Sequence, residues 1–126
     1  MATLNATINR TVTVDDSVIV VSWAALATNG DLGDTQSFAQ FSDKTFIVSG
    51  SFTGAPTVVI EGSNDGTNWQ PLSNRQGTAM SFTAAGMNTS QDRPVYVRPR
   101  VSAGGGGASV LVTVACHRTD LPGNGG

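Results

Sequence analysis

The stretch Thr57–Leu72, TVVIEGSNDGTNWQPL, contains a strand, a tight polar turn and a second strand. Val58 and Ile60 recur at the two-residue period of a β-strand, so both face the same side of a sheet. The Ser63–Asn68 segment then breaks the run. Its Asp-Gly pair between asparagines favours a hairpin, because glycine accepts a positive φ and Asn and Asp bond to their own backbone. Trp69 follows at once, and we interpret it as the core anchor of this hairpin.

Short strands are predicted on both sides of the hairpin. Leu4–Val14 alternates apolar residues with Thr and Asn, and Val18–Leu26 is a continuous apolar run whose Trp23 is expected in the core. Further strands are expected within 38–52, 78–83, 95–101 and 109–118. In 38–52 we expect Phe46 and Val48 to point inward, and in 109–118 Val110, Val112, Val114 and Cys116 share one face. Since no segment has helical apolar spacing over three turns, the predicted fold is all-β, a two-sheet antiparallel β-sandwich of jelly-roll or Ig-like topology.

Several single residues carry their own predictions. Gly50 lies inside a strand pattern, which indicates a bulge or a close backbone approach. Pro71 limits the second strand of the hairpin to a short or edge position. Pro99 lacks an N–H and predicts an unpaired position with a free side on its strand. Ala84–Pro94 is expected to be a polar loop, in which Met87 either packs on the core or is offered to a partner chain.

The composition indicates one domain with an unusual surface. The chain has 126 residues, of which 13% are charged, against a usual value of about 25%. A surface rich in Thr, Ser and Asn but poor in charge is typical of a protein packed against neighbours, and a plain soluble β domain is the alternative. We expect a single domain over residues 1–120 and a flexible tail over 121–126.

The charge pattern does not favour nucleic acid as a partner. The net charge is −2, and the one basic cluster consists of Arg93, Arg98 and Arg100. In the strand Val95–Val101 we expect the valines to face inward, and Tyr96, Arg98 and Arg100 to face the other way. The two arginines then form a local patch, interpreted as a solvated or salt-bridged face in preference to an anion site.

Catalytic, metal and cofactor chemistry is not predicted. Cys116 and His117 are the only residues of their types, and as strand neighbours they point to opposite faces, so they cannot form a catalytic pair or a zinc site. Glu61 is the only glutamate and lies on a strand. Asn29, Asp31 and Asp34 do not match known calcium-loop spacings.

Membrane association and secretion are not predicted either. No apolar run approaches the ~20 residues of a membrane helix. The first residues also lack the charged and apolar regions of a signal peptide. We therefore expect a chain that is made in a cytoplasm and stays soluble.

Three segments carry a resemblance to a known family: EGSNDGTNWQPL, GTAMSFTAAGM and RPVYVRPRVSAGGGGASVLVTV. Together they resemble small β-sandwich virion proteins of tailed bacteriophages, of the capsid decoration or cement type, over roughly Ser51 to Val114. The SNDGTNW turn also recurs in β-sandwich carbohydrate-binding modules.

The resemblance implies a non-enzymatic protein of the capsid surface that binds between capsomers. Its partners would be the major capsid protein and itself, as a homotrimer, and no cofactor, nucleic acid or membrane is implied. The alternative is a carbohydrate-binding module of a phage head or tail fibre, with Trp69 and Tyr96 as stacking platforms. A tail or neck subunit of the same type is a third possibility.

The segment 1–10 is predicted to be the attachment arm. A first strand is easily left at a sheet edge, and this one has no lysine or proline to guard unpaired N–H and C=O groups. A capsid subunit or a sister protomer would supply the missing pairing by strand addition. The residues predicted to bind a partner are Thr3, Asn5, Thr7, Asn9, Met87, Arg98 and Arg100.

Overall fold

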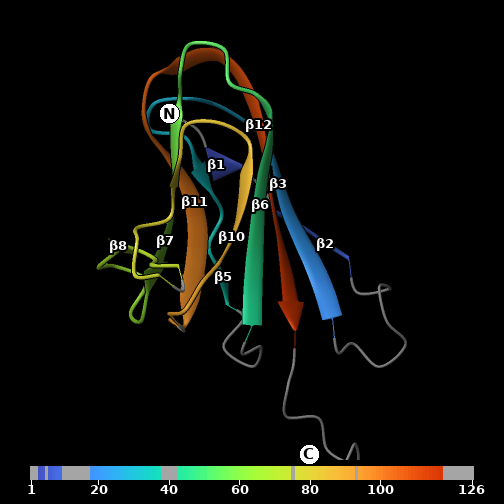
Figure 1. Ribbon diagram of the computed structural model, residues 1–126, viewed down its shortest axis with the longest axis vertical. Helices are drawn as coiled ribbons and strands as arrows, with labels where there is room; N and C mark the ends of the chain where they lie inside the picture. Colours follow the sequence, from blue (N-terminus) through green and yellow to red (C-terminus); the bar gives the residue numbers. More distant parts are fainter. Residues whose placement is uncertain are drawn as a thin grey trace, which may run out of the picture.

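The structure, a computed structural model, describes residues 3–4, 6–9, 18–37, 43–74, 76–92 and 94–117, and every regular element among them is a β-strand. Two sheets pack face to face around one core (Figure 1). The strands are β1 (Thr3–Leu4), β2 (Ala6–Asn9), β3 (Val18–Thr28), β4 (Leu32–Gly33), β5 (Gln36–Ser37), β6 (Asp43–Ser51), β7 (Thr57–Ser63), β8 (Gln70–Pro71), β9 (Ser81–Phe82), β10 (Gly86–Thr89), β11 (Tyr96–Ala103) and β12 (Gly105–His117).

The strand order defines a jelly roll. Sheet A has seven strands in the order β1-β4-β11-β7-β8, with β5 also paired to β11 and β9 to β7. Sheet B has five strands in the order β10-β6-β12-β3-β2. β4 and β5 can be taken as one interrupted strand, and so can β8 and β9. On that basis β3 pairs with β12, and the β4–β5 strand that follows β3 pairs with β11. This is the pairing of a long hairpin rolled into two Greek keys. The prediction of a two-sheet sandwich is confirmed, and of its two topologies the strand order matches the jelly roll.

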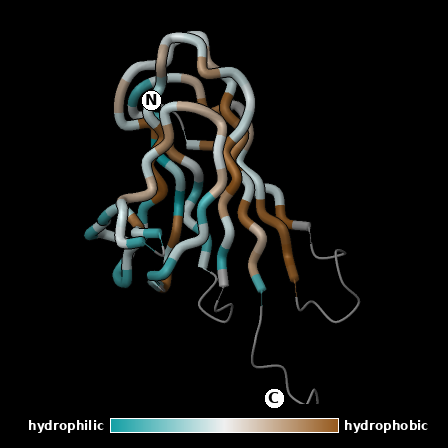
Figure 2. Tube along the Cα trace, in the orientation of Figure 1, coloured by the Kyte–Doolittle hydropathy of each residue, from teal (hydrophilic) through white to brown (hydrophobic). Residues whose placement is uncertain are grey.

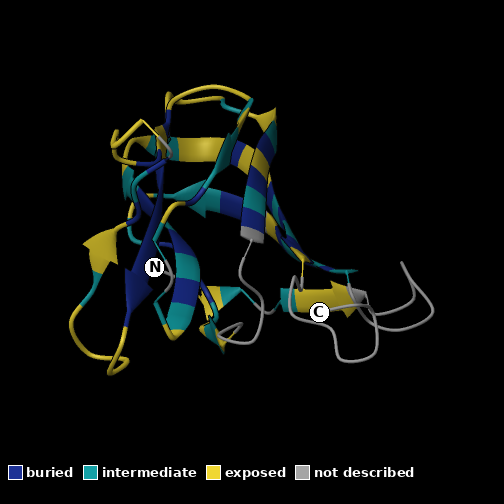
Figure 3. Cartoon of the chain, turned by 60° about the horizontal axis from the view of Figure 1, so that its bottom comes forward, coloured by how far each residue is buried: buried dark blue, intermediate teal, exposed yellow. Residues whose placement is uncertain are grey.

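Inward-facing residues of both sheets fill the core. Trp23, Phe46, Ile60, Val97 and Val114 are 0% exposed and belong to one continuous cluster. Hydrophobic residues accordingly run along the central strands in Figure 2, and in Figure 3 the same strands alternate buried residues with intermediate or exposed ones. The predicted inward faces of β3, β6, β7 and β12 are therefore confirmed.

Trp69 is not the core anchor that the hairpin pattern predicts. It is only half-buried and lies outside the core cluster, just before β8. Arg98 stacks on its ring, with the guanidinium carbon 3.9 Å from the ring centroid. Because residue 69 precedes the short strand that Pro71 limits, strand alternation does not set the direction of its side chain. Trp23 alone is the buried tryptophan.

Other expectations for the second half of the chain also need correction. The predicted loop Ala84–Pro94 contains β10, which pairs antiparallel with β6 at the edge of sheet B. Val95 is 36% exposed rather than inward, because it precedes β11. Pro99 lies in β11, an interior strand of sheet A, between the residues that pair with β4 and those that pair with β5. The missing N–H therefore falls where the pairing on that side of β11 is interrupted, and not at a free sheet edge.

The N-terminal strands lie at the edges of both sheets, as predicted for an edge position. β1 pairs in parallel with β4 in sheet A, and β2 pairs antiparallel with β3 in sheet B. Asp34 holds the two together: its backbone N–H donates to the Leu4 carbonyl at 2.8 Å, and its Oδ1 accepts from the Ala6 N–H at 2.8 Å. The segment predicted as one strand thus crosses from one sheet to the other.

Gly50 makes the close approach that its place in the strand predicts. Its φ is +103°, and a Cβ there would lie 2.3 Å from the Ser109 carbonyl oxygen of the neighbouring β12. Any larger residue would both strain the backbone and collide with that strand. The glycine therefore allows β6 and β12 to stay paired up to their common end.

Candidate functional site

Among the described positions, the outer face of sheet B carries charged or titratable residues only at one end, where Asp43 of β6 pairs with His117 of β12. One cross-strand row runs over all five strands, from Thr7 through Ser22, Thr113 and Ile47 to Met87. We call this surface the uncharged face. Its outward residues are Thr7, Val20, Ser22, Ala24, Thr45, Ile47, Ser49, Met87, Thr89, Leu111, Thr113 and Ala115.

Three large apolar side chains project from the uncharged face. Met87 is 64% exposed, Ile47 45% and Leu111 37%. Ile47 pairs with Met87 on one side and with Thr113 on the other, so the apolar atoms form a strip across β10, β6 and β12. Hydroxyl groups satisfy one another beside the strip, as between Thr45 Oγ1 and Thr89 Oγ1 at 3.1 Å. Such a surface loses little hydration when a partner covers it.

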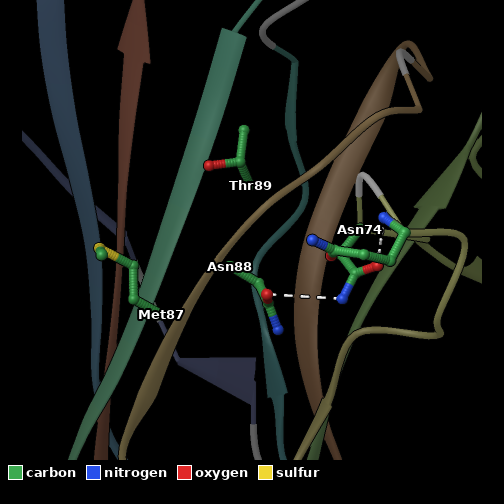
Figure 4. A pocket seen from close by; sticks show the side chains of 5 residues that line it. Asn74, Met87, Asn88 and Thr89 are labelled. Carbon is green, nitrogen blue, oxygen red and sulfur yellow. Dashed lines mark hydrogen bonds between the residues drawn. The ribbon is translucent and has the colours of Figure 1, made fainter.

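A polar hollow of about 210 Å³ adjoins the strip at the open edge of β10 (Figure 4). Asn74 and Asn88 meet there through a hydrogen bond of 3.4 Å from Asn74 Nδ2 to Asn88 Oδ1. Met87 points away from this pair, toward the outer side of β6. The hollow therefore lies between β10 and the segment that carries Asn74 and Gln76, and the apolar strip ends beside it.

The outer face of sheet A has the opposite character. Glu61 on β7 lies directly across from Arg98 on β11, and its carboxylate is bonded by two arginines, Arg98 Nε at 2.7 Å and Arg100 Nε at 3.0 Å. Trp69 lies against the Arg98 guanidinium. We call Glu61, Trp69, Arg98 and Arg100 the arginine–tryptophan cluster. Although Glu61 is only 3% exposed, both of its oxygens have a cationic partner, which offsets the cost of burying the charge.

The turn beside this cluster is held rigidly by Asp65. Its Oδ1 accepts from the Thr67 and Asn68 N–H groups, both at 2.8 Å, and its Oδ2 accepts from Asn68 Nδ2 at 2.7 Å. Donation from the backbone of Asn68 and then of Thr67 lowers the pKa of this carboxyl well below its usual range. Residues 64–68 are exposed, so a solvent-facing polar loop is fixed in one shape.

The residues predicted to bind a partner fall on two surfaces. Thr7 and Met87 lie on the uncharged face, whereas Thr3 pairs within sheet A. Arg98 and Arg100 belong to the arginine–tryptophan cluster, so their interpretation as a salt-bridged face is confirmed. Asn5 and the side chain of Asn9 lie outside the described residues, as do Arg93 and the tail 121–126.

The two candidate stacking residues, in contrast, both lie beside Arg98 on the outer side of sheet A. Tyr96 and Arg98 are alternate residues of β11 and share its outer side, and Arg98 covers Trp69. The Tyr96 ring also lies 3.8 Å from where a Cβ of Gly66 would be, so it packs against the turn that leads to Trp69. Both aromatic side chains are half-buried.

Sequence reasoning missed Ile47 and Leu111 on the uncharged face and the role of Glu61 in the arginine–tryptophan cluster. Ile47 and Leu111 are apolar residues at outward strand positions, where the alternating pattern predicts polar ones. Their departure from that pattern could have identified them as surface apolar residues. Glu61 was treated as an isolated strand residue, because its partners lie 37 and 39 positions further along the chain.

The remaining reactive side chains do not form a site. Cys116 is buried and His117 is exposed on the opposite face of β12, as predicted. Burial raises the pKa of the Cys116 thiol to about 12, with a smaller opposing effect from Lys44. Asp31 and Asp34 accept hydrogen bonds from neighbouring backbone, and no group of three or more His, Cys, Asp or Glu within the described ranges could hold a metal ion. No helix in that part of the chain is long and apolar enough to cross a membrane.

Comparison with known proteins supports the fold. No family model and no curated protein sequence matches the chain. Among solved structures, the chain is similar to the SPBc2 prophage-derived protein YomS, with 16% identity and a TM-score of 0.57, over 79% of this chain and 93% of that one. At this identity the likeness shows a shared fold. Weaker likenesses include oxalate oxidase (11% identity, TM-score 0.47, over 91% of this chain and 52% of that one) and a Bacillus endospore appendage protein (12% identity, TM-score 0.44, over 92% and 91%).

Proposed function

We propose that the chain is a structural protein of a tailed-phage particle that decorates the capsid surface and binds between capsomers through the uncharged face. The observation that carries the proposal is the unbroken row from Thr7 to Met87, which crosses five strands without a charge and contains exposed Ile47. The prophage origin of a protein with the same fold supports it, together with the resemblance of the central and C-terminal segments to decoration proteins.

The mechanism is interfacial. Covering apolar side chains contributes about 25 cal/mol per Å² of apolar surface removed from water. The Thr and Ser hydroxyls around the strip exchange hydrogen bonds with a partner at little desolvation cost. Each site then adds a modest free energy, and many copies on one particle shift the shell strongly toward its assembled state by mass action.

Binding to the shell is tested with heads of the phage that encodes this chain, expanded and prepared without it. Ile47→Lys places a charge in the middle of the uncharged face at a side chain that is already 45% exposed, so the fold should tolerate it. Because an unpaired ammonium would have to be buried on docking, we expect at least tenfold weaker binding to heads, measured by co-sedimentation.

Ser81→Lys is the matched control, since Ser81 is exposed on β9 of sheet A. It adds the same charge to the opposite side of the sandwich and should bind heads like the native chain. If Ile47→Lys binds normally and Ser81→Lys does not, the uncharged face is not the docking surface.

Self-association as a homotrimer, with the major capsid protein as partner, belongs to the same proposal. Light scattering should give a mass of three chains of 12.9 kDa each, free in solution or on release from heads. The arm 1–10 is proposed to contribute to docking through the open edge of β2. Deletion of residues 2–9 should then abolish head binding and leave the β circular-dichroism signal intact.

A further inference from the structure

The arginine–tryptophan cluster presents unused hydrogen-bond donors in a fixed arrangement. Arg98 and Arg100 each bind Glu61 through Nε, at 2.7 and 3.0 Å. Within the described part of the chain the terminal Nη atoms of both guanidinium groups have no hydrogen-bond partner. A guanidinium carries five N–H donors, so most remain available. Two positive charges and one carboxylate leave a net charge of +1 on the array.

The array is rigid before any ligand arrives. Glu61 is buried and anchors both arginines, and the Trp69 ring 3.9 Å from Arg98 limits the rotation of the guanidinium. The side chain of Arg98 is 19% exposed and that of Arg100 is 37% exposed, so solvent can still reach both. Because the side chains are already ordered, little conformational entropy is lost on binding.

The surroundings favour a saccharide over a protein as the ligand. Exposed residues 64–68 supply hydroxyl and amide groups beside the half-buried rings of Trp69 and Tyr96, and the one carboxylate among them, Asp65, is bonded to donors of Thr67 and Asn68 within the turn. Aromatic surface combined with a few fixed polar groups is the usual lining of a small-ligand site. Of the large exposed apolar side chains in the described ranges, all but Val95 belong to strands of sheet B, so this side lacks the apolar centre of a protein interface.

We propose that the arginine–tryptophan cluster and the adjoining turn bind an acidic saccharide. The Nη atoms of Arg98 and Arg100 hold the sugar carboxylate, and the aromatic side chains and the turn contact the pyranose ring and its hydroxyls. A planar carboxylate suits the fork of a guanidinium better than it suits a lysine. The site lies on the sheet opposite the uncharged face, and it does not depend on docking to a shell.

The test uses the full chain and titrates it with trigalacturonate, with sialyllactose and with the fully methyl-esterified trigalacturonate as a neutral match. We expect saturable calorimetric binding of at least one acidic sugar and at least tenfold weaker binding of the ester. Binding should also change the fluorescence of Trp69, which is half-buried, while Trp23 is in the core. Failure of both acidic sugars to bind at millimolar concentration, or equal binding of the ester, would overturn the proposal.

Variants locate the site. Arg100→Gln should weaken binding of the acidic sugar at least tenfold. Arg100→Lys keeps the positive charge but loses the forked guanidinium, so it should give an intermediate loss. It replaces Arg100→Gln in the test if the glutamine variant does not fold. Ile47→Lys, on the other sheet, should bind the sugar like the native chain. Equal losses in Arg100→Lys and Ile47→Lys would refute the assignment. So would equally tight binding of a glutamate hexapeptide, which would indicate a protein carboxylate as the natural ligand.

Discussion

Replacing Trp23 with phenylalanine tests the central packing of this fold. Trp23 is 0% exposed, and its Nε1–H donates to the Asp34 carbonyl and to Asp34 Oδ1, both at 3.0 Å. Phenylalanine keeps most of the ring but removes this donor. Leaving the Asp34 acceptors short of a partner costs about 1–3 kcal/mol, and the smaller ring leaves a gap worth roughly a further 1 kcal/mol. We expect the free energy of unfolding to fall by about 2–4 kcal/mol in total.

The same substitution should loosen the N-terminal strands before the rest of the molecule. Asp34 also binds the Leu4 carbonyl and the Ala6 N–H, so it ties β1 and β2 to the sandwich. Once Trp23 no longer orients Asp34, hydrogen exchange at Ala6 should accelerate more than exchange in β12. Urea unfolding followed by circular dichroism measures the global effect, because tryptophan fluorescence changes with the mutation itself.

Trp69→Phe is the matched control. Its ring is half-buried, and its stacking with Arg98 is worth about 0.5–1 kcal/mol at an exposed site, part of which phenylalanine retains. We therefore expect a loss below about 1 kcal/mol. If Trp69→Phe destabilises the protein as much as Trp23→Phe, the assignment of Trp23 as the core tryptophan and Trp69 as a surface residue is refuted.

Three further predictions concern single residues. Gly33→Ala should destabilise the fold by about 1–3 kcal/mol in urea unfolding, because the new Cβ would lie 2.5 Å from Trp23 Cδ1. Cys116, with its pKa raised to about 12, should not react with a thiol reagent at pH 8 until the chain is unfolded, and immediate reaction would contradict its burial. Since the folded-state pKa of Asp65 is lowered, its carboxylate stabilises the fold above the unfolded value of about 4, and this contribution is lost as the pH falls through the folded value. An NMR titration midpoint for Asp65 at or above about 4 would contradict this.

Strand periodicity was sufficient to predict the core. Continuous β-branched runs and clean alternation placed Trp23, Val48 and Val112 inside, and the structure buries all three completely. The Ser63–Asn68 turn could also be predicted from the sequence, because Asp65 and its neighbours form it through hydrogen bonds between residues close in the chain. Features whose cause is local in sequence were therefore predictable.

Features that depend on which strands are neighbours in a sheet could not be predicted from the sequence. β10 is polar, and it is a strand only because β6 offers it a backbone edge. The Glu61 site requires β7 to lie beside β11 in one particular register. A shift of one residue would move Arg98 and Arg100 to the other face of the sheet, and no local pattern specifies that register. Topology therefore had to be known before either surface could be assembled.

The two proposed functions use different surfaces of the molecule. A decoration protein and a saccharide-binding module would compete if both used the same face. Here the apolar, charge-free residues belong to sheet B and the fixed arginines to sheet A, with the core between them. A molecule seated on a shell through sheet B would turn the arginine–tryptophan cluster outward. Because Ile47 and Arg100 lie on opposite sheets, Ile47→Lys and Arg100→Gln should affect head binding and sugar binding independently, and one activity can fail without the other.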